Sequence, residues 1–145
     1  GKWYYFIISA LKGSQNLDGE KYYFDPVNCD MQTGWVSIQE ATGTKRYYYD
    51  PESGKQLSGW QNIDGKRYYF GLYGAYSGRI SGLDGKDYYF DSDTCELKIG
   101  WFESGKYKYY ADPNDGGALA RSKTLIIDGI SYTFDSGGTL INNIP

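Results

Sequence analysis

The residues best placed to do chemistry in this chain are aromatic, and they recur in clusters. Seven stretches set rings side by side: "WYYF" (3–6), "KYYF" (21–24), "RYYY" (46–49), "RYYF" (67–70), "DYYF" (87–90), "KYYA" (108–111) and "SYTF" (131–134). A strand with one buried face needs an apolar residue only at every second position. One ring of each cluster therefore points away from the core, and an amphipathic ring beside Lys, Arg or Asp suits a half-wet binding surface.

The ionisable residues form no pattern typical of an enzyme. The chain has no His, which removes the usual general base and metal ligand near neutral pH. Both Cys and most Asp lie in turn motifs, so a nucleophilic triad has no components. The segment "DSDTCELKIG" (91–100) resembles a calcium loop but lacks the Gly and the Glu that such a loop requires. We expect no catalytic residues, no metal ion and no cofactor.

Charge and hydropathy exclude two further classes of partner. A net charge of −3 argues against nucleic acid, because binding to a phosphate backbone needs clustered cations. No run of 18 apolar residues is present, so we expect no membrane insertion. The chain begins inside a repeat, and we expect it to be a fragment of a larger multidomain protein.

Turn motifs flank the aromatic clusters and predict β-hairpins. An Asp-Gly or Ser-Gly pair precedes most clusters, at 18–19, 64–65, 84–85, 104–105 and 128–129, and a second turn such as "DPESGK" follows. Such turns between short β-rich runs favour hairpins. We expect a second strand after each cluster, built around a single apolar residue: Met31, Leu57, Leu97, Leu119 and Leu140. No 3.6-residue period is sustained, so little helix is expected.

The spacing of the clusters predicts an all-β repeat protein. The clusters recur every 18 to 25 residues, and units this small must stack on their neighbours to bury a core. We expect an elongated solenoid of stacked β-hairpins forming one repeat domain over 1–145. Its approximate repeats are 1–13, 16–35, 36–60, 61–79, 80–101, 102–122 and 123–145. The segment "GLYGAYSGRISG" (71–82) departs from the repeat and is expected to bend the array.

Alternation along each strand divides the three positions of a triplet between two faces. The third position is Phe in five of the seven units, whereas the positions before and after the triplet are mostly charged. The first and third residues are therefore expected to face inward, and the central one, usually Tyr, outward. Three Gly-Trp pairs, at 34–35, 59–60 and 100–101, add indoles. We expect grooves between consecutive hairpins, floored by the central tyrosines and these indoles.

The recurring pattern resembles the cell-wall-binding repeat superfamily. The clearest copies are "GEKYYFDPVNCDMQTGW" (19–35), "RYYYDPESGKQLSGW" (46–60) and "GKDYYFDSDTCELKIGW" (85–101). The superfamily contains choline-binding repeats, YG-type glucan-binding repeats and the short repeats of clostridial toxins. The resemblance implies a left-handed solenoid with about three hairpins per superhelical turn. It also implies ligands held between hairpins, no catalytic activity, and a place at the extracellular surface or cell wall of a Gram-positive organism.

The branches of this superfamily bind different ligands, and the residues favour a sugar. The resemblance implies that a choline cage needs a Trp directly before its Tyr pair, and only Trp3 satisfies this. Elsewhere the position holds, in order, Lys21, Arg46, Arg67, Asp87, Lys108 and Ser131. A cation there repels an ammonium group and removes a π face. A cell-wall polysaccharide or glucan is the preferred partner; choline or teichoic acid, or a spacer with no small ligand, remain alternatives.

The candidate ligand contacts join each Gly-Trp indole to the central Tyr of the triplet that follows it. These pairs are Trp35 with Tyr48, Trp60 with Tyr69, and Trp101 with Tyr110, and Trp3, Tyr23 and Tyr89 are further candidates. The sequence leaves open whether a pair meets within one hairpin or between neighbours. Cys29 and Cys95 occupy the turn position that Gly holds in "DPESG" and are predicted not to pair with each other, although bonds between chains remain open.

Overall fold

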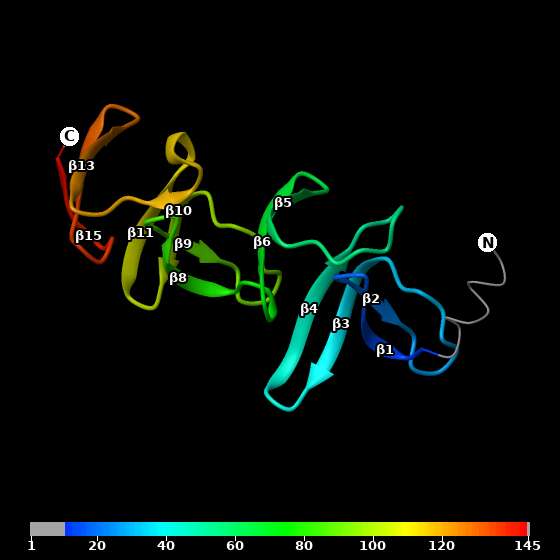
Figure 1. Cartoon of the computed structure of the whole chain (residues 1–145). Helices are drawn as coiled ribbons and strands as arrows, with labels where there is room; N and C mark the ends of the chain where they lie inside the picture. Colours follow the sequence, from blue (N-terminus) through cyan, green and yellow to red (C-terminus); the bar gives the residue numbers. More distant parts are fainter. Residues whose placement is uncertain (1–10, 145) are drawn as a thin grey trace. The chain divides into compact units, whose positions relative to one another are not determined.

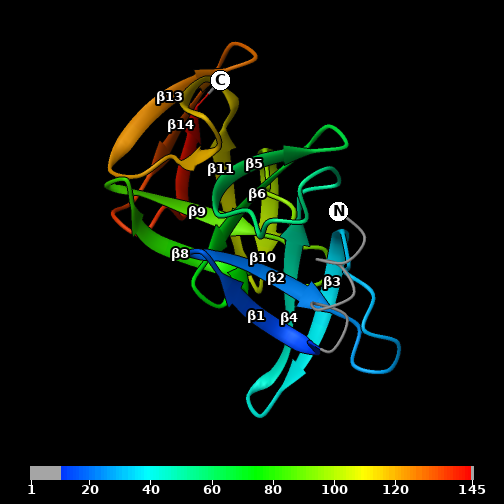
Figure 2. The same cartoon turned by 45° about the vertical axis from the view of Figure 1, so that its right-hand side comes forward.

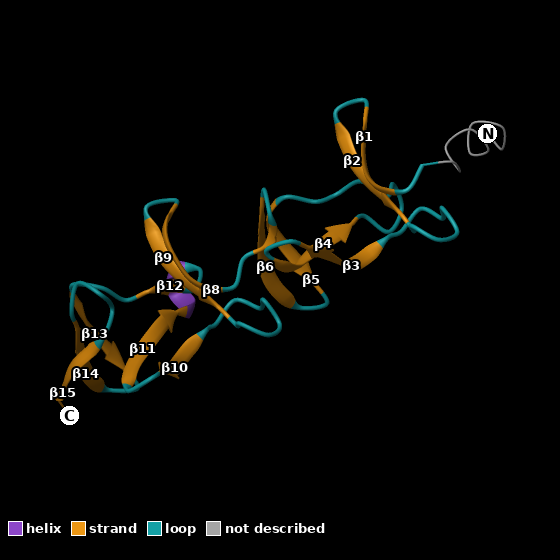
Figure 3. Ribbon diagram, turned by 90° about the horizontal axis from the view of Figure 1, so that it is seen from below, coloured by secondary structure: helices purple, strands orange, loops and turns teal. Residues whose placement is uncertain are grey.

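The computed structural model of the chain describes residues 11–144, and strands dominate it (Figures 1 and 3). Within that range the helical structure is limited to a single 3-10 turn at Pro113–Asp115. The expectation of an all-β fold with little helix is therefore confirmed. The first aromatic cluster, with Trp3, lies outside the described residues.

The strands run in chain order and pair locally. Their bounds are β1 Gly13–Leu17, β2 Glu20–Phe24, β3 Gly34–Glu40, β4 Gly43–Tyr49, β5 Gly59–Ile63, β6 Lys66–Gly71, β7 Gly74–Ala75, β8 Gly78–Leu83, β9 Lys86–Phe90, β10 Gly100–Ser104, β11 Tyr107–Asp112, β12 Ala118–Leu119, β13 Lys123–Ile127, β14 Ile130–Phe134 and β15 Leu140–Ile144. The two-stranded sheets are β1–β2, β3–β4 and β8–β9. The three-stranded sheets are β5–β6–β7, β10–β11–β12 and β13–β14–β15.

The residues divide into two compact units, which are described separately. The first comprises residues up to Gln61 together with Tyr69–Ala75, and the second comprises Asn62–Tyr68 with the residues from Tyr76 onward. In the first unit, β3 and β4 form the long ribbon coloured cyan in Figure 1. In the second unit, β14 lies between β13 and β15 (Figure 2).

Each main hairpin pairs the strand before a triplet with the triplet strand itself. In β1–β2, Leu17 pairs with Glu20, so Asp18 and Gly19 form a two-residue turn. Their φ angles of 53° and 81° are both positive, as a type I′ turn requires and as Asp-Gly permits. The same pair of positive angles recurs at 64–65, 84–85 and 128–129. The turn expected at 104–105 lies one residue later, because Ser104 itself pairs with Tyr107.

The segment after each triplet is shorter than predicted. In two places the expected second strand is reduced to a single bridge, Phe24 with Met31 and Phe90 with Leu97. In a third place the bridge joins Tyr49 to Gln56 rather than to the expected Leu57. Only Leu119 and Leu140 lie in true strands, β12 and β15. The correction has a simple cause, since the turn that follows the triplet uses most of the intervening residues.

That turn is organised by the Asp that follows most triplets. The Asp50 Oδ1 atom accepts hydrogen bonds from the backbone N–H groups of Glu52 and Ser53, each at 2.8 Å. Asp25, Asp91, Asp112 and Asp135 make the same kind of bond to residues that follow them. These are Asx turns, in which a short carboxylate replaces backbone partners. The sequence interpretation of these aspartates as turn formers is confirmed.

The core is a row of triplet side chains, largely as alternation predicts. The third position is at most 2% exposed in Phe24, Tyr49, Phe70, Phe90, Ala111 and Phe134. The first position is buried in Tyr47, Tyr68 and Tyr88, but only half-buried in Tyr22, Tyr109 and Tyr132. The central residues are half-buried throughout the described repeats. The prediction that two rings of every triplet are fully inside therefore holds for three hairpins and not for the others.

Candidate functional site

The predicted indole–tyrosine pairs meet within single hairpins. Trp35 and Tyr48 are direct cross-strand partners on β3 and β4, with ring centres 5.3 Å apart in an edge-to-face arrangement. Trp101 and Tyr110 are partners on β10 and β11, with ring centres 4.9 Å apart. Trp60 and Tyr69 lie 5.2 Å apart. The question that the sequence left open is thereby answered in favour of one hairpin.

A cation of the chain lies against two of these indoles. The guanidinium carbon of Arg46 is 4.4 Å from the ring centre of Trp35. The Nζ atom of Lys108 is 4.9 Å from the ring centre of Trp101. Both cations sit two residues before the central Tyr, so they share its strand face. Each is placed for a cation–π interaction with the indole.

The same indoles also pack on neighbouring hairpins. Trp35 has its ring centre 5.5 Å from that of Phe70, in the first unit. Trp101 lies 4.7 Å from Tyr132 and 5.8 Å from Phe134, in the second unit. The indoles are half-buried, so they support hairpin packing and still keep part of their surface exposed.

Among the residues that the structure describes, two candidate tyrosines have no indole partner. Tyr23 stands opposite Ser14, and its ring lies 6.3 Å from that of Tyr49. Tyr89 stands opposite Arg79, and its ring lies 4.9 Å from that of Phe102. The structure therefore groups the sequence candidates into three Trp–Tyr pairs and two tyrosines in different surroundings, and Trp3 lies outside the described residues.

The hairpin β8–β9 carries an arginine and an aspartate at the two positions where several other hairpins carry a tryptophan and a cation. Arg79 stands where β3–β4, β5–β6 and β10–β11 have Trp, and Asp87 stands where those three hairpins have a cation. The Asp87 Oδ2 atom accepts hydrogen bonds from Arg79 at 2.8 Å and from Arg121 at 3.2 Å, and Asp87 is only 4% exposed. Burial favours a higher pKa for Asp87, but the bonds from Arg79 and Gly82 and the charge of Arg121 outweigh it and lower the pKa.

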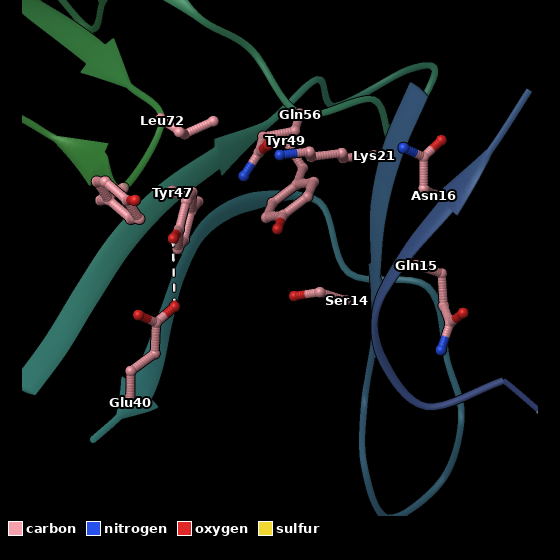
Figure 4. Close-up of a pocket in the computed structure, with 10 residues that line it drawn as sticks. Ser14, Gln15, Asn16, Lys21, Glu40, Tyr47, Tyr49, Gln56 and Leu72 are labelled. Carbon is pink, nitrogen blue, oxygen red and sulfur yellow. Dashed lines mark hydrogen bonds between the residues drawn. The ribbon is translucent and has the colours of Figure 1, made fainter. Parts of the chain in front are cut away.

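A groove in the first unit lies between the hairpins β1–β2 and β3–β4 (Figure 4). Its volume is about 390 Å³, and it is lined by Ser14, Gln15, Asn16, Lys21, Glu40, Tyr47, Tyr49, Gln56, Leu72 and Tyr73. The predicted grooves between consecutive hairpins thus have a counterpart here. Its aromatic wall, however, comes from the first and third triplet positions, Tyr47 and Tyr49, and not from the central Tyr48.

Sequence reasoning predicted grooves between hairpins but named none of the residues that line this one as a ligand contact. The available signal was the irregular segment after β6, where Gly71 replaces the usual Asp. Without that Asp, the chain turns within two residues, because Gly71 pairs with Gly74. The turn residues Leu72 and Tyr73 are 71% and 70% exposed and lie at the groove.

Polar contacts organise the groove wall. The hydroxyl of Tyr47 donates to the Glu40 carboxylate at 3.3 Å. Burial, followed by the Glu40 charge, raises the pKa of Tyr47. Burial raises the pKa of Tyr49 to about 12, although a side-chain hydrogen bond with Gln56 opposes the shift. The groove therefore presents neutral phenols, amides and one charge of each sign.

Other kinds of site were searched for within residues 11–144. No group of three or more His, Cys, Asp and Glu side chains there is placed to hold a metal ion. No helix in that range has the length and apolar character needed to cross a membrane. Cys29 and Cys95 are not joined by a disulfide, as predicted.

Comparisons with known proteins place these features in a family. Residues 11–58 match the family described as choline-binding repeat. Glucosyltransferase-S of Streptococcus mutans is 30% identical over 83% of this chain and 8% of its own length. Choline binding protein F of Streptococcus pneumoniae is 30% identical, with a TM-score of 0.78 over 91% of this chain and 41% of that chain. CbpF in complex with ipratropium gives 32% identity and the same TM-score, covering 91% and 39% of the two chains.

Residues 11–58 match a choline-binding repeat, and over most of its length the chain is similar to a choline binding protein and to glucosyltransferases. The similarity to cell-wall-binding repeats that the aromatic triplets and Gly-Trp pairs predict is therefore confirmed. The chain spans less than a tenth of the length of the curated relatives it matches, so the activity and partners of a whole protein do not follow from these relatives.

Proposed function

We propose that this chain is a non-catalytic module that attaches a larger extracellular protein to cell-wall polysaccharide or glucan. Two Trp–Tyr pairs, Trp35 with Tyr48 and Trp101 with Tyr110, lie half-buried beside a cation of the same hairpin. Sugars carry apolar C–H faces and hydroxyl edges, which match such a surface. The hairpins repeat this surface along the chain, so several weak contacts with a repetitive polymer can gain about 10²–10⁴ in avidity.

The observation that supports a neutral sugar over choline is the position of Arg46 against Trp35, at 4.4 Å. A quaternary ammonium ligand would need that indole face for its own cation–π contact. Lys108 takes the same place against Trp101. In both hairpins an ammonium ligand would remain near the positive charge of that side chain, and a neutral sugar avoids this repulsion.

Choline is the second candidate, because residues 11–58 match the choline-binding repeat family. In that range the Gly-Trp indole is Trp35, against which Arg46 already lies. We therefore rank choline below a saccharide for this chain.

Retention on insoluble polysaccharide particles tests the proposal. We expect the wild-type chain to be retained by glucan or cell-wall particles and released by the soluble polymer. The double variant Trp60→Ala/Trp101→Ala should be retained several-fold less. A matched control is Thr124→Ala/Thr133→Ala, because this Thr pair occupies the same cross-strand position in β13–β14 without any ring.

Three results separate the candidates. Equal retention of the Trp double variant and the wild type would contradict the role of the pairs. If free choline released the chain from the particles and soluble sugars did not, choline would be favoured as the ligand. No retention on any particle would contradict attachment to a polysaccharide altogether.

A further inference from the structure

We propose that the free edge of strand β13 is a self-association surface, on which a second copy of this chain adds its own β13 in antiparallel orientation. Such self-association goes beyond attachment to polysaccharide and does not depend on it. Strand β13, Lys123–Ile127, is an edge strand of the three-stranded sheet β13–β14–β15 in the second unit. Figure 2 shows it in orange on the side of β14 that faces away from β15.

The turn after β13 determines which backbone groups of the strand face outward. Ile127 pairs with Ile130 across the two-residue turn Asp128–Gly129, and such a closing pair exchanges both of its backbone hydrogen bonds. Bonded and non-bonded pairs alternate along an antiparallel ladder, so the N–H and C=O groups of Thr124 and Ile126 point away from β14. Within the part of the chain that the structure describes, these groups make no backbone hydrogen bond to another segment. They are therefore available to a further strand.

The side chains along this edge are less polar than those of the equivalent strands. Ile126, directly before the residue that closes the turn, is 77% exposed. In the first strands of the other described hairpins, the same position holds a polar residue or glycine: Asn16, Gln39, Asn62, Gly82 and Glu103. Polar and charged side chains on an edge strand oppose pairing with another chain. Because β13 has an isoleucine there, this edge is the one best suited to such pairing.

The order of charges along β13 favours an antiparallel copy of the same strand. Lys123 begins the strand, and Asp128 follows its last residue. When Leu125 of one copy stands opposite Leu125 of the other, Lys123 of each copy comes within reach of Asp128 of the other. A parallel copy would instead bring like charges together. The antiparallel register also sets Thr124 opposite Ile126 of the second copy, so that their outward N–H and C=O groups bond to each other.

The side chains on the exposed face tolerate this pairing. The hydroxyls of Thr124 and Thr133 are hydrogen-bonded to each other at 2.8 Å. The methyl group of Thr124 can therefore contact Ile126 of the second copy without leaving a polar atom unpaired. Because the contact is limited to one short strand from each copy, the dimer is weak and reversible.

Sedimentation equilibrium of the whole 145-residue chain, without any saccharide, tests the association. We expect a change from monomer to dimer between about 10 μM and 1 mM, the range in which weak interfaces dissociate. Ile126→Lys should raise the dissociation constant of the dimer at least about tenfold, because an edge lysine opposes strand pairing. The matched control is Ile141→Lys, since Ile141 is also exposed, at 61%, but lies on β15. It should leave the dissociation constant unchanged.

Amide hydrogen exchange locates the surface. The N–H groups of Thr124 and Ile126 should exchange more slowly at high than at low protein concentration. The N–H groups of Leu125 and Ile127 already bond to β14, so they serve as internal references and should change much less. This selective protection is expected of edge pairing and not of contact through a side-chain face.

A charge reversal tests the antiparallel arrangement. Lys123→Glu should weaken the dimer several-fold, because it places a carboxylate beside Asp128 of the other copy. Lys106→Glu changes the net charge equally at an exposed position outside β13 and should leave the dimer intact. Equal effects of the two reversals would overturn the antiparallel arrangement.

The remaining outcomes are equally distinct. A chain that stays monomeric over the whole range contradicts self-association. A dimer that survives Ile126→Lys and leaves the outward amides unprotected uses another surface. Growth beyond a dimer would show that β13 pairs with a different strand. If polysaccharide particles slow these amides in a monomeric chain, the edge binds the polymer and not a second copy. Retention on particles is measured separately, so its failure would leave the self-association intact.

Discussion

Arg46 lies against the indole of Trp35, with its guanidinium carbon 4.4 Å from the ring centre. Arg46 stands opposite Ser37, and Trp35 opposite Tyr48, so the cation reaches the indole diagonally across the strand pair. The chain thus supplies its own cation to a ring that could otherwise receive one from a ligand. The type of residue directly before the triplet should therefore influence which ligand the hairpin binds.

Removing that cation should open the indole to ammonium ligands. We expect Arg46→Ala to lower the free energy of unfolding by about 0.5–1 kcal/mol, the usual size of an exposed cation–π contact. Choline should then protect the variant against heat more than it protects the wild type. The measurement is the shift of the melting temperature with choline concentration, together with quenching of Trp fluorescence.

Arg46→Lys is the control for this experiment, because it keeps a cation near Trp35. It should respond to choline as the wild type does. If Arg46→Ala gains no response to choline, the guanidinium is not what keeps an ammonium ligand away from this hairpin.

The buried carboxylate of Asp87 should make the second unit sensitive to acid. Its pKa in the folded chain is lowered, so the stabilisation is fully present above the pKa of the unfolded chain, about 3.9, and is lost as the pH falls through the folded value. Asp87→Asn should cost about 2–3 kcal/mol at pH 7, because it leaves Arg79 and Arg121 without their carboxylate.

Melting experiments between pH 7 and pH 2 check this prediction. The gap in melting temperature between the wild type and Asp87→Asn should narrow as the pH falls below about 4. A gap that stays constant over this range would show that the charge of Asp87 contributes nothing to stability.

The turns and the core rows could be predicted from the sequence, because both depend on local chemistry. Asp18 and Gly19 have positive φ angles, which their residue types allow and a type I′ turn requires. Cys29 aligns in sequence with Gly54, which predicts that the two residues occupy the same place in their turns. Both have left-handed backbones, with φ of 66° and 75°. Period-two alternation located the buried third position of each triplet, such as Phe24.

Features that depend on contacts between hairpins could not be predicted. The groove requires Lys21, Tyr47 and Tyr73 to meet, although they are far apart in the sequence and belong to three different segments. The packing of Trp35 on Phe70 likewise depends on how one hairpin rests on another. Alternation assigns a side chain to a face, but it does not say which neighbouring element covers that face.

Cys29 and Gly54 occupy equivalent left-handed positions in two Asx turns, and substitutions at these two positions should change the free energy of unfolding in opposite directions. Cys29→Gly should raise the free energy of unfolding by about 0.5–1 kcal/mol, because a residue with a Cβ is strained at positive φ. Gly54→Ala should lower it by about 1–2 kcal/mol for the same reason, and the added Cβ would also lie 2.7 Å from the Sδ atom of Met31.

Urea unfolding of the two variants and the wild type provides the measurement. Cys29→Ala is the control, since it removes the thiol but keeps the Cβ, and it should not be stabilising. If Cys29→Gly and Cys29→Ala had the same stability, the backbone angle would not be the cause.

Alkaline pH should unfold the first unit through Tyr49, which lines the groove between β1–β2 and β3–β4 and is 1% exposed. Burial raises its pKa to about 12, above the value of about 10 in an unfolded chain. The folded state therefore keeps a proton that the unfolded state releases, and stability should be complete below about pH 10 and fall as the pH rises toward 12.

Tyr49→Phe separates this effect from the other tyrosines. It should cost about 0.5–1.5 kcal/mol at pH 7 through the lost hydrogen bond with Gln56, yet lose less of its remaining stability above pH 10 than the wild type. Spectrophotometric titration should show one fewer late-titrating phenol, whereas Tyr107→Phe, at an exposed position, should leave the late phase intact. An unchanged late phase in Tyr49→Phe would assign that phase to another tyrosine and remove the link between the groove and alkaline unfolding.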